Sequence, residues 1–361
     1  MLLLKNMILL IFITCLSLVN SVYIIPFLPS VLGFATTERI MDYHKRNYFA
    51  TTFQSGNNIH RYQRMSSHPE SCGNQVNNNL KGIAGNNCSL QSSSVGVPAT
   101  DFNKSKTLRI AVIGDVDSNQ GLTTQFEIAN RYNVQALILT GDFEYSNGNK
   151  VLSDLQSHGF TKENTDIVVG NHDSEQDVKA WLNEKEPFGQ VNFAFATDKL
   201  ALFNIDANTR FDCSSPQFEV LKSQIESSRA LYKFIVIHQP FVTVKSTYPD
   251  NGQFNCYDPM FRAAGIDEVL QAHNHNYQRF NINGLLYGVF GTGTHDTGSS
   301  MYPLNSNDWN GNNCLKCITG KNGITILDLH FNDKNPKHFV GWFIGMNREI
   351  LDSFESFFLI N

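Results

Sequence analysis

The amino-acid sequence predicts a layered α/β fold, with β-sheets sandwiched between helices, and two features predict it. From Lys106 onward, apolar runs of four to six residues alternate with segments of helical spacing, which is typical of βαβ units and a largely parallel sheet. Nearer the C-terminus, apolar runs follow one another through Gly- and Asn-rich turns, and such short connections favour antiparallel pairing.

The first elements of this region alternate in type. Apolar runs at 108–114, 136–140 and 166–169 predict strands, and helical spacing at 122–132 and 151–158 predicts the helices between them. Each run leads into a Gly that is followed by Asp or Asn. Further strands are expected at 191–195, 200–205, 234–237, 268–271, 284–290, 323–329, 339–344 and 350–358.

The N-terminal segment has the layout of a secretory signal. Lys5 precedes an apolar stretch at 7–19, and small or neutral residues follow it. We therefore expect residues 1–21 to be a signal peptide and the mature protein to be secreted or to reside in the lumen of the endomembrane system. Apolar character resumes at 22–28, so an uncleaved N-terminal anchor is the alternative.

A polar N-terminal region separates this signal from the folded domain. Residues 22–104 are expected to be low-complexity sequence and linker, because 66–98 is rich in Ser, Asn and Gly and offers little apolar surface to bury. No periodicity predicts a structure at 35–63. The folded domain is expected at 105–361.

The composition is that of a globular protein with a moderately charged surface. Hydrophobic residues make up 41% of the 361 residues and charged residues 17%, and the formal net charge is −5. Lys and Arg are scattered singly, so the clustered basic surface of a nucleic-acid-binding protein is not indicated. Two glycosylation sequons, at Asn87 and Asn103, lie in polar sequence and fit a secreted glycoprotein.

Seven cysteines are present, and Cys15 lies in the expected signal. The other six, an even number in a secreted chain, predict disulfides. Cys72 with Cys88 is the natural local pair. The Cys314-Leu-Lys-Cys317 segment fits a short-loop disulfide better than half of a zinc site or a redox pair, because no second such segment is present.

Five short polar segments directly follow apolar runs, and their order is Gly114-Asp115-Val116-Asp117, Gly141-Asp142-Phe143-Glu144-Tyr145, Gly170-Asn171-His172-Asp173, Val236-Ile237-His238 and Ala272-His273-Asn274-His275. Ligands in layered α/β folds bind outside the carboxyl ends of the strands, so these side chains are expected to converge. Two His one residue apart, as at 273 and 275, point the same way from a strand.

This set predicts a metal centre. Carboxylate, amide and imidazole ligands suit Fe, Zn or Mn rather than Ca, which prefers oxygen alone. The ligands are too many for one tetrahedral ion and suit two ions about 3.5–4 Å apart, bridged by a carboxylate. Two such ions can activate a water molecule and hold a phosphoryl group.

The five segments resemble those of the calcineurin-like metallophosphoesterase superfamily, and they are most similar to the purple acid phosphatase branch. The resemblance covers the chain from about Lys106 to its end, and makes 105–361 a phosphoesterase domain. It implies a sandwich of two mixed β-sheets flanked by helices. It also implies a hydrolase that cleaves small-molecule phosphoesters, phosphomonoesters in the first place, with a metal-activated hydroxide.

The resemblance further implies a role for each site residue. Asp142 would bridge the two metals. The first, ferric iron, would be held by Asp115, Tyr145 and His275. The second, divalent Fe, Zn or Mn, would be held by Asn171, His238 and His273. His172 would face the phosphate and protonate the leaving group or stabilise its charge.

Two positions depart from the wider superfamily. Its first segment reads Asp-x-His with the His as ligand, whereas this chain has Asp117 there. Tyr145 stands three residues after Asp142, as in the purple branch, and is the favoured ligand. Asp117 could instead bind the metal, hydrogen-bond a ligand or cap the following helix, and Tyr145 could be a packing residue. His295, in a Gly-rich turn, could contact the substrate or lie in a simple loop.

The same resemblance leaves competing functions open. The protein serine/threonine phosphatases of this superfamily carry an Asp-Arg-Gly after the second Gly-Asp, whereas this chain has Glu144-Tyr145-Ser146-Asn147 there, which disfavours phosphoprotein substrates. A phosphodiesterase or nucleotide hydrolase remains an alternative, as does a metal-binding relative without catalysis.

Overall fold

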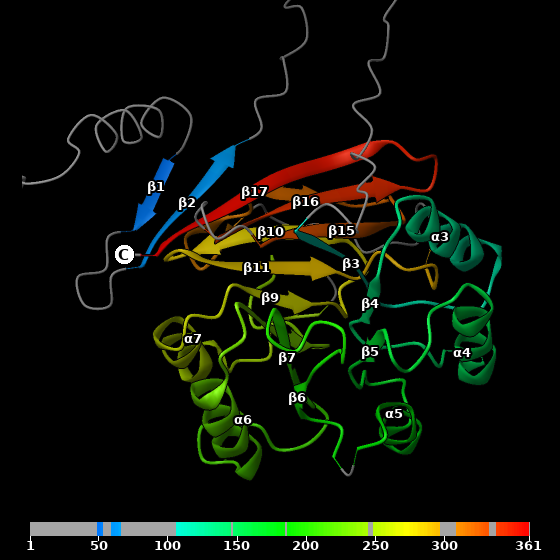
Figure 1. Ribbon diagram of the computed structural model, residues 1–361, viewed down its shortest axis with the longest axis horizontal. Helices are drawn as coiled ribbons and strands as arrows, with labels where there is room; N and C mark the ends of the chain where they lie inside the picture. The colour runs from blue at the N-terminus through cyan, green and yellow to red at the C-terminus, as the bar shows by residue number, and fades with distance from the viewer. Residues whose placement is uncertain are drawn as a thin grey trace, which may run out of the picture. The chain divides into compact units, whose positions relative to one another are not determined.

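The computed structural model describes residues 49–52, 59–65 and 106–360, except 146, 185, 245–247, 297–307 and 332–336. The expected signal peptide, the 66–98 linker, the Cys72–Cys88 pair and both sequons lie outside the described residues. Two mixed β-sheets pack face to face with helices on their outer sides, so the predicted layered α/β fold is confirmed (Figure 1).

The first sheet has the strand order β1-β2-β17-β16-β15-β3-β4-β5. Its strands are β1 (Phe49–Thr52), β2 (Ile59–Met65), β3 (Thr107–Ile113), β4 (Ala136–Leu139), β5 (Thr165–Ile167), β15 (Gly323–His330), β16 (Lys337–Gly345) and β17 (Ile350–Ile360). Strands β3, β4 and β5 are parallel, and the others pair antiparallel, as the short connections near the C-terminus predicted.

The second sheet has the strand order β14-β10-β11-β9-β8-β7-β6. Its strands are β6 (Gly189–Val191), β7 (Leu200–Ile205), β8 (Tyr232–Ile237), β9 (Glu268–Gln271), β10 (Tyr277–Ile282), β11 (Leu285–Phe290) and β14 (Lys316–Ile318). The central strands β7, β8, β9 and β11 are parallel. A separate hairpin is formed by β12 (Asp308–Trp309) and β13 (Asn312–Asn313).

Helices cover the outer faces of both sheets. The first sheet packs against α3 (Gln120–Arg131), α4 (Gly148–Ser157) and α5 (Glu175–Leu182), and the second against α6 (Pro216–Ser227) and α7 (Phe254–Ala263). Four of these helices begin at a side chain that accepts a backbone N–H bond, as N-caps do: Asn119, Asn147, Ser174 and Ser215. A third apolar cluster, with Ile110, Leu202 and Phe339, fills the space between the sheets.

The structure also contains elements that the sequence patterns did not predict. Strand β10 was missed because the buried polar Gln278 and Arg279 interrupt its apolar alternation. Helix α7 contains Pro259, which hides its periodicity. Helix α6 begins with a Ser cap followed by Pro, which is a helix-start signal in the sequence. The strand expected at 191–195 lies earlier, as β6, and β1 and β2 fall where no structure was predicted.

Two disulfides lie within the described residues. Cys314 and Cys317 form the predicted short-loop disulfide, with their Cα atoms 6.0 Å apart. Cys213 is joined to Cys256, which ties the segment before α6 to helix α7, with a Cα separation of 5.7 Å. Among the residues that the structure describes, no helix combines the length and apolar character needed to cross a bilayer.

Candidate metal centre

The five polar segments meet at one end of the two sheets, beyond the carboxyl ends of β3, β4, β5, β8 and β9 (Figure 1). Three of the predicted ligands adopt left-handed backbone conformations there: Asp115 (φ 59°), Asp142 (φ 55°) and His273 (φ 68°). Such conformations cost of order 1–3 kcal/mol each for residues other than Gly, and they gather at functional sites. The left-handed conformations turn the backbone just beyond the strand ends, at the three ligand positions.

The first donor group is centred on the hydroxyl of Tyr145. It lies 2.7 Å from Asp142 Oδ2, 3.1 Å from Asp115 Oδ1 and 3.0 Å from His275 Nε2. The hydroxyl has one proton to share among these electron-rich atoms. Burial and the two carboxylates raise the pKa of Tyr145 well above its ordinary value. A cation at this point would offset that effect and satisfy the surplus lone pairs.

The second donor group is centred on His238 Nε2. This atom lies 3.2 Å from Asp142 Oδ2, 3.2 Å from Asn171 Oδ1 and 3.2 Å from His273 Nδ1. His238 Nδ1 lies 2.9 Å from the carbonyl oxygen of Thr140. A carbonyl can only accept, so Nδ1 carries a proton, and Nε2 is the ring atom that faces the other donors.

One atom belongs to both groups, Oδ2 of Asp142. It contacts the Tyr145 hydroxyl on one side and His238 Nε2 on the other. The side chains of Asp142, His238 and His273 also each offer a donor atom, and these atoms lie within 4.8 Å of one another. The residues therefore fit a pair of cations that share a bridging carboxylate, since oxygen and imidazole donors suit Fe, Zn and Mn.

Electrostatic coupling within the centre is strong. Burial would raise the pKa of Asp142, but the neighbouring His238 holds it below its ordinary value. Burial would lower the pKa of His238 and of His275, yet Asp142 and Asp115 raise them to about 9. Burial and the nearby His238 lower the pKa of His273 to about 4. Protons thus balance the buried carboxylates in the protein alone, and cations would displace them.

Glycines let the loops of the centre approach each other. A Cβ on Gly141 would lie 2.6 Å from His238 Nδ1, and one on Gly170 would lie 2.1 Å from Asp142 Oδ1. Gly141 also has a φ of 91°, a conformation that favours glycine. Close packing therefore requires a glycine before two of the ligands: Gly141 before Asp142 and Gly170 before Asn171.

Asp173 fixes two of the loops, a role the sequence patterns did not reveal. Its carboxylate accepts hydrogen bonds from the backbone N–H groups of Asp142 (2.7 Å), Phe143 (2.7 Å), Glu144 (3.1 Å) and Gly170 (2.8 Å). Burial and the charge of Asp142 raise its pKa to about 6. Its place at the end of the Gly-Asn-His-Asp segment was the available signal.

The remaining predicted site residues surround the first donor group. His172 is exposed, its backbone N–H donates to Asp142 Oδ1 at 2.9 Å, and its ring centroid lies 4.5 Å from that of Tyr145. His295 stacks on Tyr145, with ring centroids 3.4 Å apart and planes 10° apart. Asp117 accepts from the N–H of Ser118 and lies 4.0 Å from His295, outside both donor groups.

Two further residues contact predicted ligands and were not singled out by the sequence. Tyr248 stacks on the ring of His273, with centroids 4.1 Å apart. Asp296 Oδ2 lies 2.6 Å from Nδ1 of His275. Neither residue follows an apolar run directly, so no strand-end pattern marked them. The α3 N-cap is Asn119, and the capping role considered for Asp117 belongs to it.

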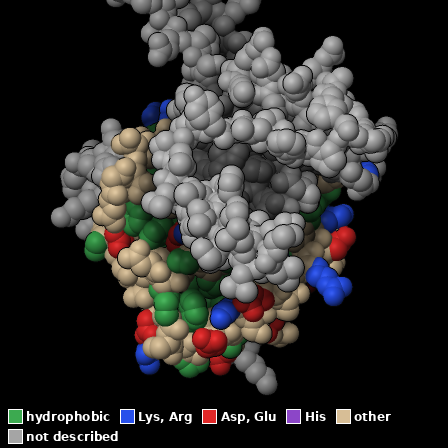
Figure 2. Space-filling model, turned by 90° about the vertical axis from the view of Figure 1, so that its left-hand side faces the viewer, with side chains coloured by type: hydrophobic (Ala, Val, Ile, Leu, Met, Phe, Trp, Pro, Cys, Tyr) green, Lys and Arg blue, Asp and Glu red, His purple; other side chains and the backbone are tan. Residues whose placement is uncertain are grey.

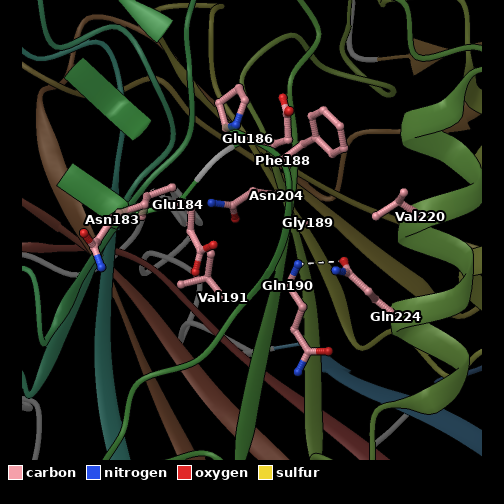
Figure 3. Close-up of a pocket in the computed structure, with 12 residues that line it drawn as sticks. Asn183, Glu184, Glu186, Phe188, Gly189, Gln190, Val191, Asn204, Val220 and Gln224 are labelled. Atoms are coloured by element: carbon pink, nitrogen blue, oxygen red, sulfur yellow. Dashed lines mark hydrogen bonds between the residues drawn. The ribbon is translucent and has the colours of Figure 1, made fainter. Parts of the chain in front are cut away.

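The surface outside the centre carries no concentration of one charge in the view of Figure 2, where the described acidic and basic side chains lie next to each other. A separate pocket of about 590 Å³ lies between α6 and the edge strand β6 (Figure 3). Glu184, Glu186, Asn204 and Gln224 are among its lining residues, and none of the predicted site residues is.

Comparison with known proteins gives the family. Residues 108–277 match the family model described as calcineurin-like phosphoesterase. This range holds the segments of Asp115, Asp142, Asn171, His238 and the two histidines after β9. Among curated proteins, none matches the sequence.

Solved structures share the fold. The chain is similar to the purple acid phosphatase PPD1 from yellow lupin (Lupinus luteus) seeds, with a TM-score of 0.54 and 12% identity over 70% of this chain and 54% of the lupin chain. It is also similar to GAP50, the anchor in the inner membrane complex of Plasmodium, with a TM-score of 0.49 and 16% identity over 69% of this chain and 88% of GAP50. The match spans about half the length of the lupin protein. Residues 108–277 of the chain thus match a calcineurin-like phosphoesterase domain, and the two mixed sheets with flanking helices have the fold of such a domain.

Proposed function

We propose that the protein is a metal-dependent phosphomonoesterase whose centre holds two cations, iron together with Zn, Mn or Fe. The observation that carries the proposal is the shared Oδ2 atom of Asp142, which contacts the central atom of both donor groups. Asp115, Tyr145 and His275 would complete one coordination site. Asn171, His238 and His273 would complete the other.

Bound cations supply an activated water molecule and neutralise the charge of a phosphoryl group. The chain's own residues hold the donors in place. The left-handed backbones of Asp115 and Asp142 aim their carboxylates, and Asp173 locks the loops that carry Asp142 and Asn171. His172, exposed beside Tyr145, is placed to donate a proton to a leaving-group oxygen.

A small-molecule phosphoester is the proposed substrate, because the matched family model is that of phosphoesterases and the formal net charge of −5 does not favour a polyanionic partner. We also propose that the protein is secreted or lumenal. The two disulfides support an oxidising compartment.

The test compares p-nitrophenyl phosphate with bis-p-nitrophenyl phosphate, using protein stripped of metal and then reconstituted with iron plus zinc, manganese or further iron. We expect release of nitrophenol from the monoester, dependent on reconstitution. A preference for the diester would replace the proposal with a phosphodiesterase. Absence of turnover of either compound, with two metals bound per chain, would leave a metal-binding protein without catalysis.

A further inference from the structure

The segment Gly291–Asp296, which follows β11, lies against the first donor group. The N–H of Gly293 donates to the carbonyl of Gly114 at 2.8 Å, and the N–H of His295 donates to the carbonyl of Asp115 at 3.2 Å. A Cβ on Gly291 would lie 2.6 Å from Asp115 Oδ2, and one on Gly293 would lie 2.3 Å from the Asp115 carbonyl oxygen. The segment is thus built to pack directly on a predicted ligand.

Side chains from other elements fix this segment in place. Asn119, the N-cap of α3, donates through Nδ2 to the carbonyl of Thr294 at 2.9 Å. Asn322 donates through Nδ2 to the carbonyls of Gly293 and Asp296, the latter at 2.7 Å. The backbone of Asp296 is therefore held from outside the segment, and its side chain has little freedom to leave the centre.

The carboxylate of Asp296 contacts the centre through the ring of His275. Its Oδ2 atom lies 2.6 Å from Nδ1 of His275, whose Nε2 faces Asp115 and the Tyr145 hydroxyl. The imidazole of His275 is 5% exposed and the Asp296 side chain 23%, so the contact is buried on the His275 side and partly open to water on the other. When a cation displaces the Nε2 proton of His275, a carboxylate at Nδ1 keeps the proton on that nitrogen and makes Nε2 a stronger donor.

We propose that Asp296 is the positioning residue of the first donor group. By this inference, which rests on the proposed function, Asp296 sets the orientation and donor strength of His275 toward a ferric ion, and the segment Gly291–Asp296 is a sixth part of the centre. Asp296 itself touches neither cation nor substrate. The feature is specific to this donor group, because His238 of the second group has a neutral carbonyl, that of Thr140, at the same place.

The proposal is tested with the full chain, stripped of metal and reconstituted with ferric iron and zinc. The variants are Asp296→Ala, Asp296→Asn and Asp296→Glu, with Asp154→Asn on the surface of α4 as the matched control. Iron affinity, the visible charge-transfer band and thermal unfolding of the metal-free protein are measured. The band reports on a Tyr145–iron bond, so Tyr145→Phe, which lacks the hydroxyl, is the control variant that should show no band.

We expect Asp296→Ala to weaken iron binding by about 10–100-fold, which is typical for the loss of a partner behind a ligand. Asp296→Asn can still accept from Nδ1 but lacks the charge, so it should keep iron better than the Ala variant and show the band at longer wavelength, because the iron is then poorer in electrons. Asp296→Glu should restore part of the affinity. The control should match the wild type in all three measurements.

Wild-type iron affinity together with an unshifted band in both Asp296→Ala and Asp296→Asn would overturn the positioning role. So would equal losses of zinc and iron in the Asn variant, since Asp296 faces only the first donor group. Wild-type protein that shows the band but hydrolyses no phosphoester would refute the proposed catalysis and leave the role of Asp296 standing. Wild-type protein that binds no iron would overturn both.

Discussion

Two buried clusters of unlike charges lie toward opposite ends of β3, and they differ in whether their donors and acceptors match. Arg109, near the start of the strand, donates to both carboxylate oxygens of Asp328, at 2.5 and 2.7 Å, and to the carbonyl of Tyr132, the C-cap of α3, at 2.7 Å. Arg109 and Asp328 are register partners on β3 and β15. Here the donors and acceptors match, and the cluster is complete without any ligand.

The metal centre, at the end of the same strand, has the opposite balance. The oxygen atoms of Asp115, Asp142 and Asn171 converge with imidazole nitrogens, with no Arg or Lys among the described donors that contact them, and the backbones of two of these residues are strained. The comparison teaches that burial and ion pairing alone do not mark a site. What distinguishes the centre is that protons on His238 and His275 supply its positive charge, and cations can displace these protons.

The largest expected effect is on the atom that both donor groups share. Asp142→Ala should remove the bridging oxygen, reduce bound metal below one ion per chain and lower phosphomonoester turnover by at least about 10²-fold. His238→Ala should do the same for the second donor group. Metal analysis and turnover of p-nitrophenyl phosphate measure both.

His158→Ala, which removes an imidazole at the C-cap of α4, is the control for these variants and should retain metal and activity. Full activity in Asp142→Ala would mean that the acceptors of the centre are a structural network like that of Arg109, and the contrast between the two clusters would fail.

Substitutions in the Arg109–Asp328 cluster should change the stability of the protein and leave its metal content and activity unchanged. Arg109→Met leaves the buried carboxylate of Asp328 without its partner, so the free energy of unfolding should fall by about 3–5 kcal/mol. Urea denaturation measures this change, while metal content per folded chain should stay at the wild-type value. The double variant Arg109→Met, Asp328→Leu should recover most of the loss. Loss of metal from the folded single variant would show that the two clusters are coupled.

A smaller effect is expected where a buried acid has only a neutral partner. Asp166 on β5 accepts from Nδ2 of Asn204 on β7 at 2.8 Å, and this bond joins the two sheets. Burial, only partly offset by this hydrogen bond, raises the pKa of Asp166 from 3.8 to about 7. Between these values the folded state binds more protons than the unfolded state, so stability falls as pH rises, by up to about 1.4 kcal/mol per pH unit.

Asp166→Asn removes the titrating group and should flatten this part of the pH dependence. Urea denaturation of metal-free protein at pH 5, 6 and 7 measures the change in slope. An unchanged slope would show that Asp166 is charged in the folded protein. The hydrogen bond from Asn204 would then stabilise the buried carboxylate as well as a positively charged partner would.

The sequence predicted the ligands of the centre better than the residues that hold them. Asp115, Asp142 and Asn171 each stand one residue beyond an apolar run and a Gly, so local pattern placed them. Asp173 and Asp296 act through contacts 30 and 21 residues away along the chain, with Phe143 and His275. Such contacts depend on how loops pack after the sheets have formed, and no periodicity encodes them.

The fold shows the same division. Strands β7 and β9 were predicted to the residue because both are wholly buried and each has consecutive apolar residues at its centre. Strand β10 was missed because its polar residues are satisfied by tertiary contacts, such as that between Arg279 and Asp352 at 3.0 Å. Local patterns therefore report the apolar faces of the elements, whereas polar residues with distant partners become readable only in the folded structure.

The smallest expected effect sets the baseline for these comparisons. Lys150 and Asp154 form an i,i+4 pair on α4 at 2.9 Å, but the Lys side chain is 55% exposed. Water screens this pair, so Lys150→Ala should change the free energy of unfolding by less than about 0.5 kcal/mol and leave metal content unchanged. A loss as large as that expected for Arg109→Met would mean that exposed and buried pairs contribute alike. Burial would then explain neither the stability of the Arg109–Asp328 cluster nor the affinity of the metal centre.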